Sequence, residues 1–163
     1  MRTITILLML IIILLPRSYA ASTFNLDFHV QLITQPCVVD GQTVIPVNLG
    51  SQIAASLADA EYVDFTIPLK DCPDTIPTIS LKFTGNPAGA ANEYIKNTGT
   101  AENVAIEIRD KTDNSLVSNG TTLSRNLSEI NSADFDLKAR MVPLGEISGG
   151  SVAGTVDFTI VYP

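Results

Sequence analysis

The chain has 163 residues, and its 10 basic against 17 acidic side chains give it a formal net charge of −7 at pH 7. This acidic balance makes nucleic acid and anionic membranes poor partners, because both repel a negatively charged protein. The single histidine excludes enzymes of sandwich fold that bind a metal through several histidines, such as copper–zinc dismutases.

The first twenty residues predict a secretory signal peptide. An uninterrupted apolar run covers residues 6–15, and these ten residues are fewer than the roughly 20 that a membrane-spanning helix needs. Small residues at Ser18 and Ala20 place the cleavage after Ala20. We therefore expect an exported chain over residues 21–163. Without the two arginines of the signal peptide it has 8 basic and 17 acidic residues, a charge of −9.

The two cysteines predict one disulfide. The mature chain has 143 residues (163 less 20), which is enough for a single domain with a sizeable core. Export exposes Cys37 and Cys72 to an oxidising compartment, where a disulfide is the natural interpretation. A metal pair and a reactive thiol are the competing interpretations, and they need further ligands or an activating base that we do not find nearby in the sequence.

A strand pattern without a local partner opens the mature chain. Apolar and polar side chains alternate over residues 24–32, which is typical of a strand with one buried face. No two-residue hairpin signal follows to fold the segment back onto a neighbour. Its apolar positions are Phe24, Leu26, Phe28, Val30 and Leu32.

Six further segments have strand patterns separated by Gly, Pro and Asn, and together they predict an antiparallel immunoglobulin-like sandwich. Between the first two of them, residues 53–60 could form about two helical turns. Scattered carboxylates, Asp110 and Asp113 among them, are expected on a solvated surface. The predicted strands are residues 44–49, 62–69, 79–83, 104–108, 135–141 and 152–162.

Such a sandwich needs about seven strands to close both sheets, and here the sixth is the last. An unpaired front strand and a missing final strand fit each other if each chain completes the next by strand addition. A contact of this head-to-tail kind generates a filament. The alternative is a closed, secreted sandwich that binds a ligand or a carbohydrate; Phe158, Ile160 and Tyr162 would then be ordinary core residues.

The chain resembles the pilin subunits of the chaperone–usher pathway, in particular those of type 1 and P pili. The resemblance covers the mature chain and includes Pro36-Cys37 after the alternating extension, the segment FTIPLKDC over 65–72 and the segment NVAIEIRD over 103–110. Pilins of this family typically have a penultimate tyrosine and a glycine at the fourteenth position from the end. Tyr162 and Gly150 match both features.

The resemblance implies an incomplete sandwich with three parts: a signal peptide (1–20), an N-terminal donor-strand extension (21–36) and a pilin domain (37–163). It implies a structural fimbrial subunit that is not an enzyme, binds no cofactor or metal, and is exported through the periplasm to the cell surface. The implied partners are a periplasmic pilus chaperone, an outer-membrane usher and neighbouring pilin subunits, with no nucleic acid.

The resemblance also implies a site for the incoming strand. The chaperone and the next subunit's extension would bind beside the last strand, and the chaperone would hold the terminal carboxylate. Donor extensions of the family usually have glycine seven residues before the cysteine, where this chain has Val30, and this departure favours a minor subunit with a particular acceptor. The residues implied for the acceptor strand are Gly150, Val156, Phe158, Ile160, Tyr162 and Pro163.

Overall fold

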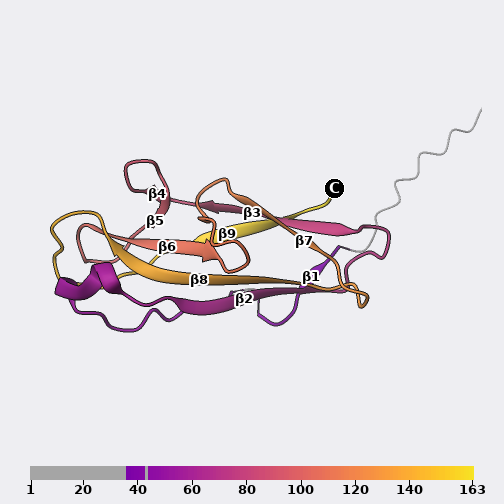
Figure 1. Cartoon of the computed structure of the whole chain (residues 1–163), viewed down its shortest axis with the longest axis horizontal. Coiled ribbons are helices and arrows are strands. Elements are labelled where there is room, and N and C mark those ends of the chain that lie inside the picture. The colour runs from indigo at the N-terminus through magenta and orange to yellow at the C-terminus, as the bar shows by residue number, and fades with distance from the viewer. Residues whose placement is uncertain (1–35, 43) are drawn as a thin grey trace, which may run out of the picture. The chain divides into compact units, whose positions relative to one another are not determined.

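The computed structural model describes residues 36–42 and 44–163, which form two antiparallel sheets packed face to face (Figure 1). A six-stranded sheet has the order β1-β2-β8-β6-β5-β4, and a three-stranded sheet has the order β7-β3-β9. The larger sheet comprises β1 (Val38–Val39), β2 (Val63–Lys70), β4 (Pro87–Ala88), β5 (Tyr94–Lys96), β6 (Val104–Asp110) and β8 (Ala133–Pro143). The smaller sheet comprises β3 (Thr78–Gly85), β7 (Thr122–Asn126) and β9 (Val156–Val161), and a short 3-10 helix, η1 (Ala54–Asp59), precedes β2. The expected immunoglobulin-like sandwich is confirmed.

The long strands form where apolar and polar side chains alternate. In β8 the side chains of Phe135 and Leu137 are buried, whereas that of Asp136 is exposed. β2 lies antiparallel to β8, with Phe65 opposite Leu137. Because successive side chains of a strand point to opposite faces, one face of β8 and of β3 packs on the other sheet and the other face bears the exposed residues; β6 is the exception, since none of its residues is exposed.

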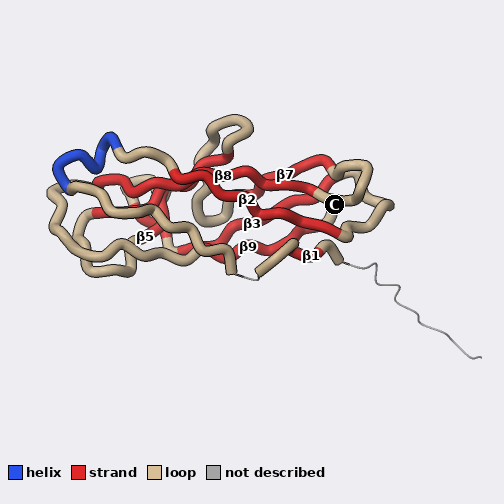
Figure 2. Tube along the Cα trace, turned by 90° about the horizontal axis from the view of Figure 1, so that it is seen from below, coloured by secondary structure: helices blue, strands red, loops and turns tan. Residues whose placement is uncertain are grey.

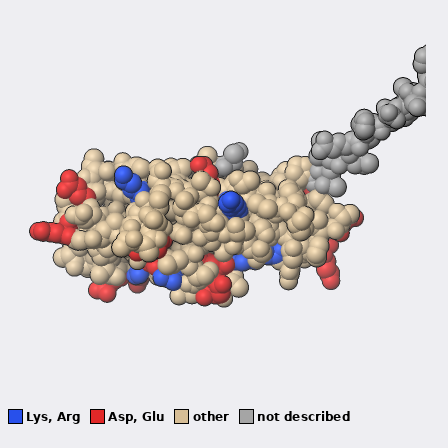
Figure 3. Space-filling model, turned by 90° about the horizontal axis from the view of Figure 1, so that it is seen from above, with Lys and Arg blue, Asp and Glu red and all other residues tan. Residues whose placement is uncertain are grey.

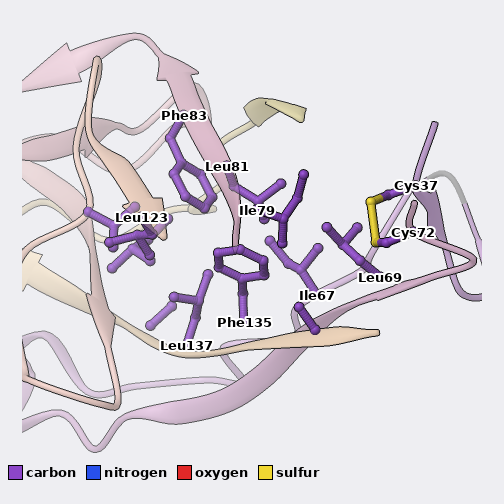
Figure 4. Close-up of a cluster of buried hydrophobic side chains, with 14 of the residues drawn as sticks. Cys37, Ile67, Leu69, Cys72, Ile79, Leu81, Phe83, Leu123, Phe135 and Leu137 are labelled. Carbon is purple, nitrogen blue, oxygen red and sulfur yellow. A yellow bond between two sulfur atoms is a disulfide. The ribbon is translucent and has the colours of Figure 1, made fainter. Parts of the chain in front are cut away.

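The core lies between the two sheets and receives side chains from both (Figure 4). Each of the labelled residues is less than a tenth exposed, so water is excluded from this part of the core. Burying such side chains contributes roughly 1.5–3 kcal/mol each relative to exposure. The labelled apolar residues are Ile67 and Leu69 of β2, Ile79, Leu81 and Phe83 of β3, Leu123 of β7, and Phe135 and Leu137 of β8.

Cys37 and Cys72 form the predicted disulfide, with an S–S distance of 2.14 Å. Cys37 directly precedes β1 and Cys72 follows β2, so the bond lies beside the β1–β2 ladder. Both cysteines are buried and pack on the main core cluster (Figure 4). The disulfide thus fastens the chain just before β1, the edge strand of the larger sheet, to the segment that follows β2, the neighbouring strand.

The predicted strand at residues 44–49 is wrong as a paired strand. Its apolar side chains, Ile45, Val47 and Leu49, alternate with exposed ones and pack partly buried against the core, as the pattern predicts. However, no main-chain hydrogen bond joins this segment to another backbone group within the described residues. The segment has a strand's side-chain pattern without a partner strand.

Four strands were not predicted, so the expected total of six is also wrong. β1, β4 and β5 have only two or three residues, too few for a period to show. β7 reads TLSRN and buries only Leu123, because it is an edge strand with a single core position. The last strand begins at Val156 rather than at residue 152, since residues 151–153 bond instead to the loop after β5.

The surface agrees with an acidic protein. On the face shown in Figure 3, acidic side chains lie at both ends, and acidic and basic ones are mixed along the lower edge. Within the described residues, none of the helical segments has the length and apolar character required to cross a bilayer. η1, which has six residues, confirms the short helix predicted within residues 53–60.

Candidate strand-acceptor site

β9 is an edge strand whose outer side has no partner among the described residues. It pairs along its length with β3, in the register Phe83↔Phe158 and Leu81↔Ile160, and with no other strand. An edge strand of this kind presents a row of unpaired N–H and C=O groups, which is a template for another chain.

The register identifies which backbone groups face the free side. Phe83 of β3 donates its N–H to Thr121 and accepts from the N–H of Gly120, so both of its main-chain groups point away from β9. The residue opposite it, Phe158, must therefore form a non-hydrogen-bonded pair with Phe83 and direct its own N–H and C=O outward. By alternation, Val156 and Ile160 do the same.

These same three residues direct their side chains to the core. Val156, Phe158 and Ile160 are partly buried and pack on the main cluster, whereas Asp157 and Thr159 between them are exposed. The Phe158 ring lies 6.3 Å from the Phe83 ring, centroid to centroid. We call Val156, Phe158 and Ile160 the acceptor edge, because each combines an apolar side chain on the core side with free backbone groups on the outer side.

The unpaired segment 44–49 adds a second feature to this site. It packs on the same core cluster as the acceptor edge, and in Figure 2 it runs along the same side of the molecule as β9, on its way to η1. Two stretches of backbone therefore lie on one cluster without a main-chain hydrogen-bonding partner in the described part of the chain: one is the free side of β9, and the other is residues 44–49.

The remaining residues implied for the acceptor strand lie at its two ends. Gly150 is outside β9, in the loop that leads to it. Tyr162 follows β9, and its hydroxyl oxygen accepts a hydrogen bond of 2.7 Å from the N–H of Cys37. Pro163 is exposed. The predicted donor residues Phe24, Leu26, Phe28, Val30 and Leu32 lie outside the described residues.

Asp110 is buried, so its expected place on the solvated surface is wrong, whereas Asp113 is exposed as expected. Asp110 accepts two hydrogen bonds, of 2.6 and 2.7 Å, from Arg125 of β7, so this ion pair joins the two sheets. Burial raises the pKa of Asp110, but the Arg125 guanidinium and the N–H of Thr112 outweigh it and hold that pKa below its usual value.

A second buried carboxylate lies on the outer face of the larger sheet. Glu107 receives hydrogen bonds from Arg109, from Arg140 and from the hydroxyl of Tyr62, at 2.6 to 2.9 Å. Burial raises the pKa of Glu107, and these donors lower it below its usual value. Both buried carboxylates are thus fully paired anions, which suits structural ion pairs better than proton transfer.

The described residues offer no group of three or more His, Cys, Asp or Glu side chains that could hold a metal ion. Sequence reasoning missed the two ion-pair clusters because their partners come from strands far apart in the chain. The one usable signal was the place of Glu107 inside the predicted strand 104–108, whereas Asp110 lies beyond that strand and belongs only to the observed β6 (Val104–Asp110).

The comparisons with known proteins agree with this architecture. The family model described as "Fimbrial protein" matches residues 25–163. The chain is 28% identical to Protein FimG of Escherichia coli and 30% identical to the uncharacterized fimbrial-like protein YdeR of the same species, over 86% of this chain and 83% of each relative. Its fold is similar to that of the P pilus rod subunit PapA, with a TM-score of 0.68 and 17% identity over 79% of this chain and all of that one. The family model covers nearly the whole chain, and the fold is an incomplete immunoglobulin-like sandwich whose last strand has a free edge among the described residues. The chain therefore belongs to the fimbrial protein family, among the pilins of the chaperone–usher pathway.

Proposed function

We propose that this fimbrial subunit polymerises by donor-strand exchange, in which residues 21–36 of one copy or of a related subunit fill the acceptor edge of the next. The observation that carries the proposal is the coincidence at β9 of apolar side chains turned to the core with unpaired backbone groups turned outward. A strand with one apolar face is the ligand that such an edge takes.

The segment 44–49, which packs on the same core cluster as the acceptor edge, also supports the proposal. An added strand between β9 and this segment would give both of them a hydrogen-bonding partner, and its apolar face would cover their shared core cluster. The alternating pattern at residues 44–49, which predicted a strand, then acquires the ladder that it lacks within the described residues.

The energetic scale is sufficient for a stable polymer. Full burial of the five apolar side chains of residues 24–32 contributes roughly 1.5–3 kcal/mol each, or about 7 to 15 kcal/mol before ordering costs. The edge adds main-chain hydrogen bonds from the three residues of the acceptor edge. A gain of this size is comparable to the net stability of a whole domain, so an uncomplemented subunit is left marginal.

The proposed strand exchange implies particular assembly partners and a particular export route for the subunit. A periplasmic chaperone would lend a temporary strand to the acceptor edge and hold the carboxylate of Pro163, and an outer-membrane usher would pass the subunit to the surface fimbrium. Residues 1–20 would act as the signal peptide. The role is structural rather than catalytic. Val30, in place of the usual glycine, supports assignment as a minor subunit with a particular neighbour.

The experiment uses a chaperone-held subunit and synthetic peptides of residues 21–36. The unchanged peptide should displace the chaperone, the Asp27→Ala peptide should do so about equally well, and the Phe28→Asp peptide should fail. The reason is that Phe28 lies on the apolar face of the peptide and Asp27 on its polar face. Equal uptake of the two altered peptides would rule out the alternating-face mechanism. A subunit that is stable and monomeric without any chaperone would favour the closed ligand-binding module instead.

A further inference from the structure

The chain that leads into the acceptor edge is fastened to the opposite sheet by a compact hydrogen-bonded structure. We call it the entry clasp, and it consists of residues 97–101, after β5, and residues 150–153, before β9. Its main-chain bonds include Thr98 N–H to the oxygen of Ala153 at 2.8 Å and Ala101 N–H to the oxygen of Ser151 at 3.0 Å. β5 belongs to the six-stranded sheet and β9 to the other, so the entry clasp bridges the two.

Asn97 is the side chain that joins both halves of the entry clasp. Its Nδ2 group donates to the oxygen of Ala101 at 2.8 Å and to that of Ser151 at 3.4 Å. Its Oδ1 atom accepts from the N–H of Gly99 at 2.8 Å and from the N–H of Ala153 at 2.9 Å. One amide therefore satisfies four main-chain groups, two of which belong to the segment just before β9.

The two glycines of the entry clasp show how closely its halves approach. A Cβ atom added to Gly150 would lie 2.5 Å from the nitrogen of Ala101, and one added to Gly99 would collide with the oxygen of Ser151. Neither neighbour is the end of a flexible side chain, so the backbone itself would have to shift. Gly150, which the sequence singled out, thus lies in the entry clasp rather than in the acceptor strand.

We propose that Asn97 is a positioning residue that sets where the acceptor edge begins, and thereby controls how tightly the C-terminal half of the donor strand is held. The inference rests on the proposed strand exchange and deepens it. Asn97 can affect β9 directly, because only two residues separate Ala153, to which Asn97 is hydrogen-bonded, from Val156, the first residue of β9. A displaced Ala153 moves the first free N–H and C=O that a donor strand would meet.

The half of the donor strand concerned follows from strand direction. Every strand pair in both sheets is antiparallel, and antiparallel pairing is also the slightly more stable arrangement per residue. A donor strand antiparallel to β9 has its C-terminal end beside Val156, near the entry clasp, and its N-terminal end beyond Ile160. Leu32 is therefore the donor side chain that should depend on Asn97, and Phe24 is the one that should not.

The test is a mutant cycle between chaperone-held subunits and peptides of residues 21–36. Asn97→Asp keeps the shape but loses both Nδ2 bonds and places a negative charge against two carbonyl oxygens. It should weaken binding of the unchanged peptide about tenfold. Thr98→Val is the matched control, since it removes only the hydroxyl bond to the oxygen of Ala153, and it should change binding by less than about threefold.

The coupling to the peptide separates positioning from general destabilisation. With a Leu32→Ala peptide the tenfold loss should shrink to about twofold, and with a Phe24→Ala peptide it should persist in full. An equal loss for both peptides would overturn the inference, as would a loss that couples to Phe24 instead. If Asn97→Asp yields no chaperone complex, Ser151→Ala replaces it, with a smaller loss of about threefold and the same coupling expected.

The two proposals fail in distinguishable ways. A wild-type subunit that takes up no peptide would overturn strand exchange, and the inference on Asn97 with it. Normal wild-type uptake together with equal binding by Asn97→Asp and Thr98→Val would overturn only the role of Asn97.

Discussion

Replacing Arg125 with methionine should destabilise the domain by about 3 kcal/mol at pH 7, because it leaves the buried carboxylate of Asp110 without its counter-ion. The side chain of Asp110 is 2% exposed and that of Arg125 is 19% exposed. Methionine keeps an apolar stem at this position, and it removes both the ion pair and the cation–π contact of the Arg125 guanidinium, whose carbon lies 5.2 Å from the centre of the Phe135 ring. Since Arg125 belongs to β7 and Asp110 to β6, the change weakens the connection between the three-stranded sheet, which contains β9, and the six-stranded sheet.

The loss should depend on pH with a definite sign. In the native protein the pKa of Asp110 lies below its unfolded value of about 3.9, so its contribution is complete above that pH and disappears as the pH falls through the folded pKa. In Arg125→Met the guanidinium is gone and burial dominates, which raises the pKa of Asp110 above the unfolded value. The unpaired carboxylate then destabilises the fold at neutral pH, and protonation relieves it. The deficit of the variant should therefore shrink between pH 7 and about pH 4.

Lys111→Met is the matched control. The Lys111–Asp64 pair has the same 2.6 Å separation, but its side chains are 40% and 60% exposed. An exposed pair contributes about 0–1 kcal/mol, so this variant should lose little and show no such pH dependence. The assay is urea unfolding of the mature chain, with saturating peptide of residues 21–36 in every sample. Similar losses in the two variants, or an Arg125→Met deficit that grows on acidification, would refute the reasoning.

Three further predictions concern single features of the fold. Replacing Cys37 and Cys72 together with serine should destabilise the domain by about 4 kcal/mol, because the bond closes a loop with a sequence separation of 35; an unfolding midpoint equal to that of the oxidised protein would contradict this. Gly150→Ala should lower the yield of chaperone-bound subunit, whereas Gly149→Ala should not, since a Cβ at Gly149 meets nothing within 4 Å; equal yields would show that the entry clasp gives way freely. Tyr162→Phe should cost about 1 kcal/mol in the same urea assay because the N–H of Cys37 loses its acceptor, and an unchanged midpoint would mean that water replaces the hydroxyl.

Much of this fold could be predicted because the local sequence pattern indicates where most of its long strands lie. β2, β3 and β8 alternate apolar and polar residues, β6 is a short run rich in apolar residues, and turn residues separate the four, so their predicted positions are correct to within two residues. The segment 44–49 carries the same signal and is predicted as a strand, yet its backbone has no main-chain partner among residues 36–42 and 44–163. A side-chain period reports burial of one face, and it cannot report whether a ladder partner exists in the same chain.

What the sequence could not show depends on contacts between distant segments. β7 was missed because one buried leucine in five residues makes no period. Asp110 was placed at the surface because its partner, Arg125, is 15 residues away and on the other sheet. Likewise, the sequence singles out Gly150 only by its position relative to the end of the chain. The steric reason for a glycine there is the close approach of the Ala101 backbone, which only the structure shows.

Amide hydrogen exchange along β9 tests the central claim most directly, because the register assigns each N–H to one side of the strand. The N–H groups of Asp157, Thr159 and Val161 point to β3, and those of the acceptor edge point outward. In an extension-deleted subunit (residues 37–163) released from its chaperone, exchange should be slow at the first three and fast at Val156, Phe158 and Ile160. Adding the peptide of residues 21–36 should slow exchange at the acceptor edge to the level of its neighbours. Uniform slow exchange along β9 before the peptide is added, or no change after it, would contradict the account.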